Sequence, residues 1–180
     1  MKKKIVYVPL AVDFLHEGHI NILRIAKKYG DVIVGLLTDE AIANYKSIPI
    51  LDYKNRELLV ENLKYVSKVV PQKTEDYSYN LNKIKPNFFV HGDDWKYDNR
   101  KKTRAKVIKT LKKWSGKLIE PKYTKNISSF KIKNKILELA SLPENRVSRL
   151  KRLLSSKKIV RILESHNSLT GLIIENLKVH

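Results

Sequence analysis

The sequence predicts an α/β fold, a Rossmann-like, doubly wound parallel sheet of about five strands with a short C-terminal appendage. Short apolar runs alternate with segments of helical periodicity, which is typical of a parallel sheet whose crossovers are helices. Residues 32–37 form an apolar run without polar interruption, which indicates a strand buried on both faces. The 180 residues, of which 42% are hydrophobic, are enough to bury a core of this kind.

Five apolar runs are the predicted strands. They cover residues 4–8, 32–37, 66–70, 87–91 and 117–119. We expect the third strand to stop at Pro71, because proline has no backbone N–H for a sheet ladder.

Helical patterns fill the intervals between the strands. The predicted helices cover residues 18–29, 53–65, 79–84, 99–114 and 128–139. Asp52 is a suitable N-cap for the second helix. The apolar residues expected to face the core are Ile22, Leu23, Ile25 and Ala26 in the first helix and Leu58, Leu59, Leu63 and Val66 in the second.

The pattern changes after residue 140, so we expect one domain over residues 1–140. Residues 141–146 are a predicted linker, and residues 147–180 are too few to form a domain of their own. Within them we expect helices at 147–154 and 169–177 and a strand at 159–163. That strand has no sheet of its own, so it should pair with another chain or stay poorly ordered.

The charge of the chain is strongly positive. Lys and Arg number 37 against 18 Asp and Glu, which gives a formal net charge of +19. Such a charge attracts polyanions, but lysine dominates and no aromatic-interleaved RNA-binding pattern is present. We therefore favour a solvated surface or attraction of nucleotides over dedicated nucleic-acid binding.

Composition excludes several classes of site. The sequence has no cysteine, which removes disulfides, thiolate metal ligands and cysteine nucleophiles. No apolar run approaches the roughly 18 residues that a membrane span needs. The first apolar run is also too short for a signal peptide, so we expect a cytoplasmic protein.

The motif His16-Glu17-Gly18-His19 follows the first predicted strand and opens the first predicted helix. Ligands of parallel sheets bind at the carboxyl ends of the strands. Two histidines three residues apart can face one ligand, Gly18 permits close approach, and the helix N-terminus favours a phosphate. The alternatives are two surface histidines in a turn, or a zinc site, which is disfavoured because no third ligand is spaced nearby.

Three further segments lie where such a site would need them. Lys46 and Arg56 flank the second crossover and could neutralise phosphates, although each taken alone is better explained as a solvated surface cation. After the fourth strand, Asp94 and Trp95 could hold a ribose and a base, or build a turn. Ser128 and Ser129 begin the last predicted helix, where they could hold phosphate or serve as an ordinary N-cap.

These segments occur in the order found in the HxGH nucleotidyltransferases, and the chain resembles their glycerol-3-phosphate cytidylyltransferase type. It resembles still more closely the nucleotidyltransferase domain that is fused to phosphoenolpyruvate mutase in phosphonate biosynthesis. The resemblance covers residues 3–140. Residues 164–175 resemble the start of the mutase domain, and the chain stops before any mutase active-site motif, so we expect no mutase activity.

The resemblance implies transfer of CMP from CTP to a phosphonate or a small phosphorylated alcohol, with release of pyrophosphate and with Mg²⁺ bound to the triphosphate. It implies a homodimer and makes a mutase a candidate partner. Two alternatives stay open, namely an adenylyltransferase on the same scaffold and a non-catalytic protein that binds nucleotide or nucleic acid through its basic face.

The resemblance also implies residue roles. His16 and His19 would donate to the α and β phosphates, and Lys46 would hold the α phosphate or the acceptor. Arg56 would hold the acceptor anion, while Asp13 would help to place metal or phosphate. The nucleotide would be held by Gly18, Asp94, Trp95, Ser128 and Ser129. The chain departs from the family pattern at Pro9, Ala11, Asn126 and Phe130.

Overall fold

A five-stranded parallel sheet, in the order β3-β2-β1-β4-β5, forms the centre of the molecule and confirms the predicted fold class. The computed structural model describes residues 3–45, 48–96, 100–124, 128, 132, 143–156 and 164–176. The strands are β1 (Ile5–Leu10), β2 (Asp31–Leu37), β3 (Lys68–Gln72), β4 (Phe88–Val90) and β5 (Lys117–Ile119).

The strand order reverses at β1, and this reversal positions the site. The chain adds β2 and β3 on one side of β1 and then returns to place β4 and β5 on the other side. The carboxyl ends of β1 and β4 therefore diverge into loops on opposite faces, which opens a crevice at that edge of the sheet.

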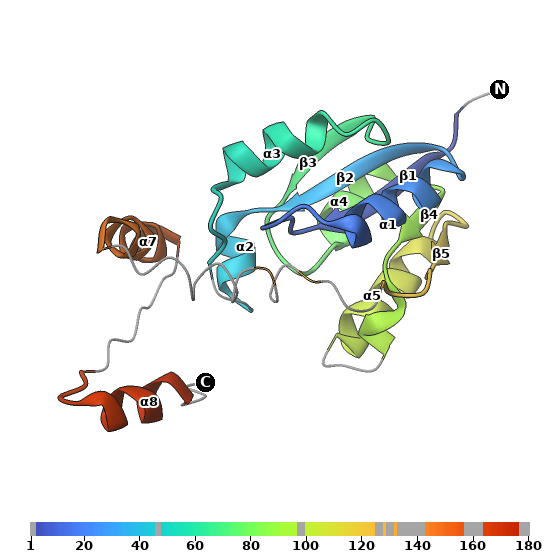
Figure 1. The fold of residues 1–180 in the computed structure, drawn as a ribbon. Helices are drawn as coiled ribbons and strands as arrows, with labels where there is room; N and C mark the ends of the chain where they lie inside the picture. Colours follow the sequence, from blue (N-terminus) through green and yellow to red (C-terminus); the bar gives the residue numbers. More distant parts are fainter. Residues whose placement is uncertain are drawn as a thin grey trace.

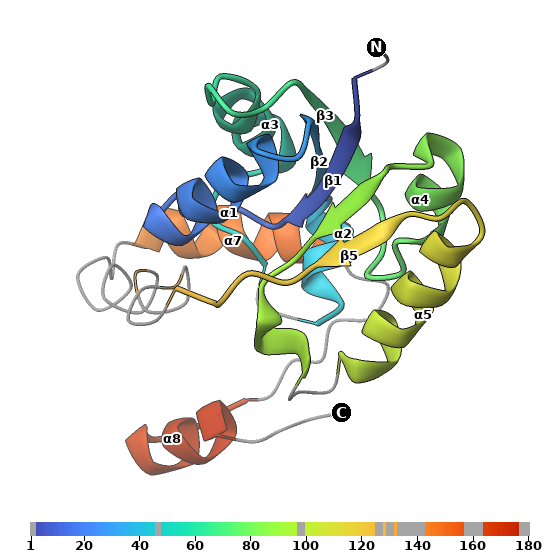
Figure 2. The same cartoon turned by 90° about the vertical axis from the view of Figure 1, so that its right-hand side faces the viewer.

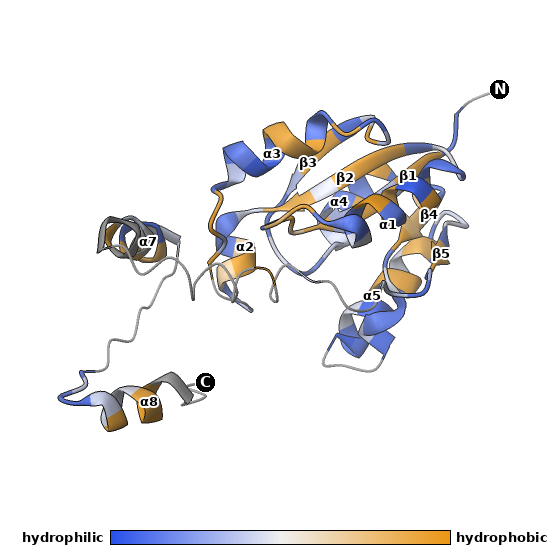
Figure 3. Ribbon diagram, viewed as in Figure 1, coloured by the Kyte–Doolittle hydropathy of each residue, from blue (hydrophilic) through white to orange (hydrophobic). Residues whose placement is uncertain are grey.

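Helices cover both faces of the sheet (Figures 1 and 2). α1 (Glu17–Lys27) and α3 (Tyr53–Glu61) lie on one face, and α4 (Ser78–Ile84) and α5 (Lys101–Lys112) lie on the other. One buried cluster joins the first face to β1 and β2 through Leu23 and Val60. A second cluster, around Phe89 and Leu111, fills the opposite face, and the strands between the two are the most apolar part of the ribbon (Figure 3).

The predicted core face of α1 is correct, whereas that of the second predicted helix is correct only in part, because Leu63 and Val66 pack against the core but Leu58 and Leu59 do not. Leu23 and Ala26 are buried in α1. In α3, Leu58 and Leu59 are 61% and 45% exposed, while the buried positions are Arg56 and Val60. Arg56 faces inward because partners from other segments satisfy its charge, and the sequence of the helix does not show those partners.

The prediction that β3 stops at Pro71 is also wrong, because the strand runs through Pro71 to Gln72. β3 is an edge strand, where a proline is tolerated because it loses only part of one ladder. The backbone N–H of Thr38 donates to the carbonyl of Gln72, and the carbonyl of Pro71 accepts from the Asn80 side chain instead. Proline therefore shifts the last hydrogen bonds of the strand without ending it.

Two short elements were not predicted. They are α2 (Asp39–Ala43), which Thr38 caps, and the 3-10 helix η1 (Asp93–Lys96). The predicted helix over 128–139 and the predicted strand over 159–163 lie outside the described residues.

The C-terminal part contains two helices, α7 (Pro143–Ser156) and α8 (Ser168–Asn176). α7 begins at Pro143, inside the predicted linker, since proline is favoured in the first turn of a helix. It contacts α2, beside which it lies in Figure 1. Among the described residues, no helix is long and apolar enough to cross a membrane.

Candidate active site

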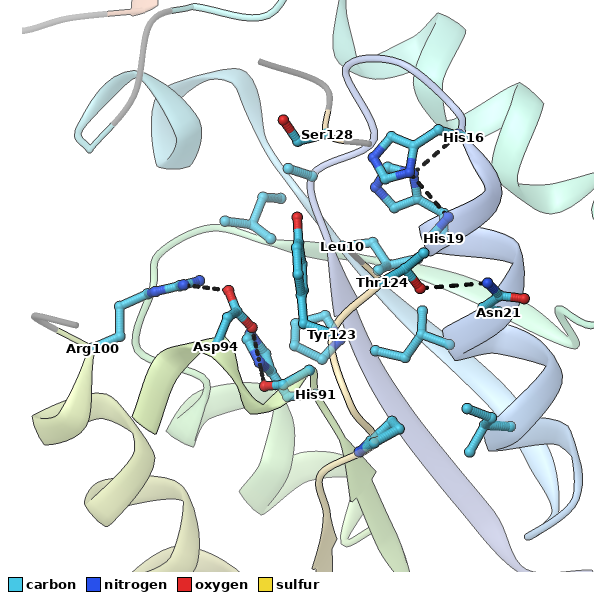
Figure 4. A pocket seen from close by; sticks show the side chains of 18 of the residues that line it. Leu10, His16, His19, Asn21, His91, Asp94, Arg100, Tyr123, Thr124 and Ser128 are labelled. Atoms are coloured by element: carbon cyan, nitrogen blue, oxygen red, sulfur yellow. Dashed lines mark hydrogen bonds and ion pairs between the residues drawn. The ribbon is translucent and has the colours of Figure 1, made fainter. Parts of the chain in front are cut away.

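A cavity opens at the carboxyl ends of β1 and β4, at the point where the strand order reverses, and encloses about 1080 Å³ of empty space including its open mouth. Figure 4 shows two histidines on one side of it and an arginine–aspartate pair on the other. Its lining includes Pro9, Leu10, Ala11, His16, Gly18, His19, Asn21, Ile22, Ile25, Leu37, Tyr45, Glu75, Tyr77, His91, Gly92, Asp94, Arg100, Pro121, Lys122, Tyr123, Thr124 and Ser128.

His16 and His19 are held by a reciprocal capping arrangement at the start of α1. His16 is the N-cap, and its Nδ1 accepts from the backbone N–H of Gly18 at 3.1 Å. Nδ1 of His19 accepts from the backbone N–H of His16 at 3.4 Å. Because both Nδ1 atoms are acceptors, the proton of a singly protonated ring here sits on Nε2, which is the nitrogen suited to donate to an anion.

The two imidazoles form one donor surface. Their ring centroids are 3.9 Å apart, and burial lowers the pKa of His16, against the opposing effect of Glu17. His16 therefore faces the cavity as a neutral ring, with His19 against it, beside the positive end of the α1 dipole, where backbone N–H groups of the first turn also point. This arrangement is suited to the phosphates of a nucleotide.

Gly18 lines the cavity and makes the arrangement of His16 possible. A Cβ at position 18 would lie 2.9 Å from Cε1 and 3.0 Å from Nδ1 of the His16 ring. Only glycine lets that ring fold back over the first turn of the helix. Hydroxyl groups from the segment after β5 complete this side: Thr124 Oγ1 accepts from Asn21 at 3.4 Å, and Ser128 lines the cavity.

The opposite wall carries an ion pair of which only one partner, Asp94, was predicted. Arg100 Nη2 and Asp94 Oδ2 are 2.6 Å apart, and both residues line the cavity. Asp93 accepts from the backbone N–H of Tyr123 at 2.9 Å and so ties the loop after β4 to the segment after β5. Burial raises the pKa of the Tyr123 hydroxyl, so this residue presents a neutral ring to the cavity.

His91 lies beneath this wall. Its Nδ1 is 2.8 Å from the carbonyl of Gly92, which requires a proton on Nδ1, and burial lowers the pKa of the ring. The ring stacks on Trp95 at a centroid distance of 4.0 Å.

Trp95 is placed differently from the expectation that it frames a base together with Asp94. It is fully buried and does not line the cavity. Its Nε1 donates to Glu120 at 2.7 Å, and Arg104 lowers the pKa of that carboxyl to about 2. Trp95 therefore supports His91 from behind, while Asp94 reaches the cavity itself.

Arg56 and Asp13 are also held away from the cavity. Arg56 is fully buried; it donates to the carbonyl of Ala11 and at 3.2 Å to that of Leu51, and it pairs with Asp39 at 2.8 Å. Asp13 accepts from the backbone N–H of Ile50 at 2.6 Å. Both residues fasten the loops around the site to one another.

The cavity thus unites five of the predicted residues, and two others lie outside the described part of the chain. Those united are His16, Gly18, His19, Asp94 and Ser128. Those outside are Lys46 and Ser129, whose roles stay predictions.

Several residues that line the cavity were missed. Asn21, Ile22 and Ile25 share a helical face with Gly18, and this spacing was the signal that could have found them. Arg100 is one cation in a lysine-rich stretch, and Tyr45, Glu75 and Tyr77 follow other strands, so their convergence depends on the sheet order.

The cavity contains side-chain oxygen atoms that could bind the Mg²⁺ implied by the resemblance. Mg²⁺ prefers oxygen ligands and retains several waters. Asp94, Thr124 and Ser128 offer such oxygens on separate walls. Among the described residues no group of three His, Asp or Glu side chains could hold a metal alone. The residues present therefore fit an ion that phosphates bring with them, and not one held in a protein cage.

Comparison with curated proteins gives relatives with several different names. The chain is 37% identical over 97 residues to glycerol-3-phosphate cytidylyltransferase of Bacillus subtilis (strain 168), covering 53% of this chain and 74% of the relative. It is 34% identical over 137 residues to ethanolamine-phosphate cytidylyltransferase of Dictyostelium discoideum, covering 73% and 36% respectively. It is also 34% identical over 86 residues to FAD synthase of Archaeoglobus fulgidus, covering 48% and 63%.

A solved structure and a family model extend the comparison. The lipopolysaccharide core biosynthesis protein from Thermoplasma volcanium GSS1 superposes with a TM-score of 0.58 at 26% identity, over 70% of this chain and 100% of that one. The model of a family described as cytidylyltransferase-like matches residues 12–135, more than half of the chain and the span that carries both walls of the cavity. The chain therefore belongs to the cytidylyltransferase-like family.

Proposed function

We propose that the protein is a cytidylyltransferase that transfers CMP from CTP to a phosphonate or a small phosphorylated alcohol and releases pyrophosphate. The observation that carries this proposal is the pair of histidines at the N-terminus of α1, whose Nδ1 atoms both accept from backbone N–H groups, so that Nε2 is the nitrogen of each ring suited to donate to a phosphate. Family membership and relatives named as cytidylyltransferases support the nucleotide and the reaction.

In the reaction, an oxygen of the acceptor phosphate or phosphonate attacks the α phosphorus of CTP. A new P–O bond forms while the bond between the α phosphorus and the bridging oxygen breaks, and the electron pair leaves with pyrophosphate. Charge grows on the phosphate oxygens, and His16 and His19 donate to them from fixed positions. No covalent enzyme intermediate is needed, so positioning and charge stabilisation account for the catalysis.

The opposite wall is suited to the nucleoside and the acceptor. Asp94 and the Tyr123 ring face the cavity where a ribose and a base would lie. Arg100 and Lys122 are the cations that line the described cavity, so we assign the acceptor anion to them, together with Lys46. Arg56 has other partners and acts through the loops. Mg²⁺ bound with the triphosphate would neutralise part of its charge, with Asp94, Thr124 and Ser128 as the oxygen ligands on offer.

A second candidate is adenylyl transfer on the same scaffold. The similarity to FAD synthase of Archaeoglobus fulgidus is the observation that favours it. The two candidates share the phosphate side of the cavity and differ in the base that the opposite wall accepts.

The test is pyrophosphate release with Mg²⁺, comparing CTP with ATP against phosphonates and phosphorylated alcohols. His16→Ala removes one donor and should lower kcat about 10²–10³-fold. His166→Ala is the matched control, because His166 is exposed beside α8, outside the cavity lining. Release with CTP that is lost only in the His16 variant supports the proposal. Release with ATP alone supports adenylyl transfer, and release with no pair from folded protein contradicts both.

A further inference from the structure

We propose that Arg152, in the C-terminal helix α7, is a positioning residue for the active site and couples the region beyond residue 142 to the histidine loop, residues 11–16, which ends at the N-cap His16. The effect on turnover rests on the proposed function, whereas the effect on the loop does not. α7 lies outside residues 12–135, the span that the family model matches.

Arg152 reaches two different segments with one guanidinium. Its Nη1 donates to the backbone carbonyl of Ile50, and its Nη2 lies 3.3 Å from Asp39 Oδ2. The side chain is 25% exposed, so most of it is covered where α7 meets α2. A planar guanidinium can hold a carbonyl and a carboxylate at once, which a lysine ammonium does less well.

The first path from Arg152 to the site runs through Asp39. The two oxygens of this carboxylate are divided between two arginines, because Oδ1 accepts from Arg56 at 2.8 Å while Oδ2 faces Arg152. Arg56 in turn donates to the carbonyl of Ala11, which lines the cavity. Asp39 therefore balances a fully buried charge on one side and holds α7 on the other.

The second path runs through Ile50. Its carbonyl accepts from Arg152, and its backbone N–H donates to Asp13 Oδ1 at 2.6 Å. Asp13 lies three residues before His16, and Ala11 lies five residues before it. Both paths thus end in the same short stretch, and together with Arg152 they close a ring of hydrogen bonds around the base of the histidine loop.

Loss of Arg152 should loosen this ring without removing it. Arg56 and Asp39 would still pair, but the carbonyl of Ile50 would lose its donor and Asp39 one of its two cations. We therefore expect the 11–16 segment to sample more conformations, with the histidines less often aligned.

The test compares Arg152→Ala and Arg152→Lys with Lys151→Ala, an exposed neighbour on the same helix. The first readout is amide hydrogen exchange, which needs no substrate. We expect exchange at the Ile50 N–H and over residues 11–16 to be roughly tenfold faster in Arg152→Ala, with β1 unchanged. Arg152→Lys should be intermediate, and Lys151→Ala should match the parent protein.

The second readout is turnover in the proposed reaction. We expect kcat to fall roughly tenfold in Arg152→Ala while the KM for the triphosphate changes little, and added guanidinium ion to restore part of the loss. Exchange that is unchanged at Ile50 and over 11–16 overturns the inference. So does faster exchange spread over β1 as well, since this would mark a general loss of stability. If no substrate pair turns over, the proposed function fails and the exchange result still decides the role of Arg152.

Discussion

Gly18 is the residue at which the geometry of the donor pair is most sensitive to a small change. Gly18→Ala adds a methyl group 2.9 Å from the His16 ring, so the ring has to turn away from the Gly18 N–H. Alanine is a better helix former than glycine by about 1 kcal/mol, so the fold should not suffer. We expect at least a tenfold lower kcat, with an unchanged or raised thermal midpoint.

Pyrophosphate release and thermal melting of the same preparation would check this prediction. Gly171→Ala in α8 is the control, because a Cβ there meets only Ser165 Oγ, at 3.5 Å. An alanine variant at position 18 that retains full kcat would show that the His16 ring is not needed in this position.

His91 makes stability depend on pH in a defined direction. Burial lowers the pKa of this ring, so between the folded pKa and the ordinary value of about 6.5 the unfolded chain binds a proton that the fold does not. The free energy of unfolding therefore rises with pH through this window and falls as pH drops below about 6.5, by at most about 1.4 kcal/mol per pH unit for one such group.

His91→Asn should reduce this slope, because Asn retains a donor for the Gly92 carbonyl and does not titrate. Urea unfolding at several values between about pH 5.5 and 7.5 measures the slope. His166→Asn, at an exposed histidine, is the control. An equal slope in the His91 variant and the parent would refute the assignment.

The residues that sequence alone could place are those whose role depends on local geometry. His16, Gly18 and His19 are neighbours in one helical turn after a strand, so their convergence follows from the local pattern. The burial of Arg56 and Trp95 could not be predicted in this way. Arg56 pairs with Asp39 and Trp95 with Glu120, and these partners are too distant in the sequence to belong to a local pattern.

The packing of β2 against β1 requires a glycine at position 35, because the Tyr7 side chain of β1 fills the space beside it. A Cβ on Gly35 would overlap the hydroxyl of Tyr7, which is itself held by Gln72 at 2.6 Å and by Asn80 at 3.0 Å. Gly35→Ala should therefore lower the free energy of unfolding by about 3 kcal/mol or more, since neither partner has room to move.

A double-mutant cycle with Tyr7→Ala, measured by urea unfolding, separates this overlap from a general strand effect. The combined variant should be less destabilised than the sum of the two, by about 1–3 kcal/mol. Simple additivity would mean that the backbone of β2, and not the tyrosine ring, sets the need for glycine.

The elements that sequence could predict are the strands and the longer helices, whose apolar runs or periodicity exceed one turn. α2 has five residues, too few to show a period, and the Thr38 side chain caps it. Within α3 itself, the inward positions Arg56 and Val60 were missed because a buried arginine is a polar residue in the sequence pattern, whereas Leu63 and Val66 after the helix were predicted correctly. The order of the strands, which creates the site, follows from how apolar faces pack and not from any single run.

Taken as a whole, the molecule carries a net charge of +19, and this charge should oppose its own compact state. Raising NaCl from about 0.02 to 0.3 M shortens the Debye length from about 20 to 6 Å and screens repulsion between distant lysines. We expect the thermal midpoint to rise across this range. A midpoint that falls would mean that ion pairs such as Arg104–Glu120 outweigh the repulsion. Differential scanning calorimetry in a low-salt buffer series would make the comparison.

The stacking of Trp95 on His91 also gives the molecule an optical signal of its own. The sequence holds two tryptophans, and the other, Trp114, follows α5 and donates to the carbonyl of Pro86. An indole emits differently beside a neutral imidazole than beside a protonated one, which quenches it. His91 lines the cavity, and Trp95 is buried behind His91 and stacks on it. The fluorescence of Trp95 should therefore respond to a ligand in the cavity although the indole does not contact that ligand. With Trp114 replaced by phenylalanine, the remaining fluorescence would follow the filling of the site in real time, with no label attached.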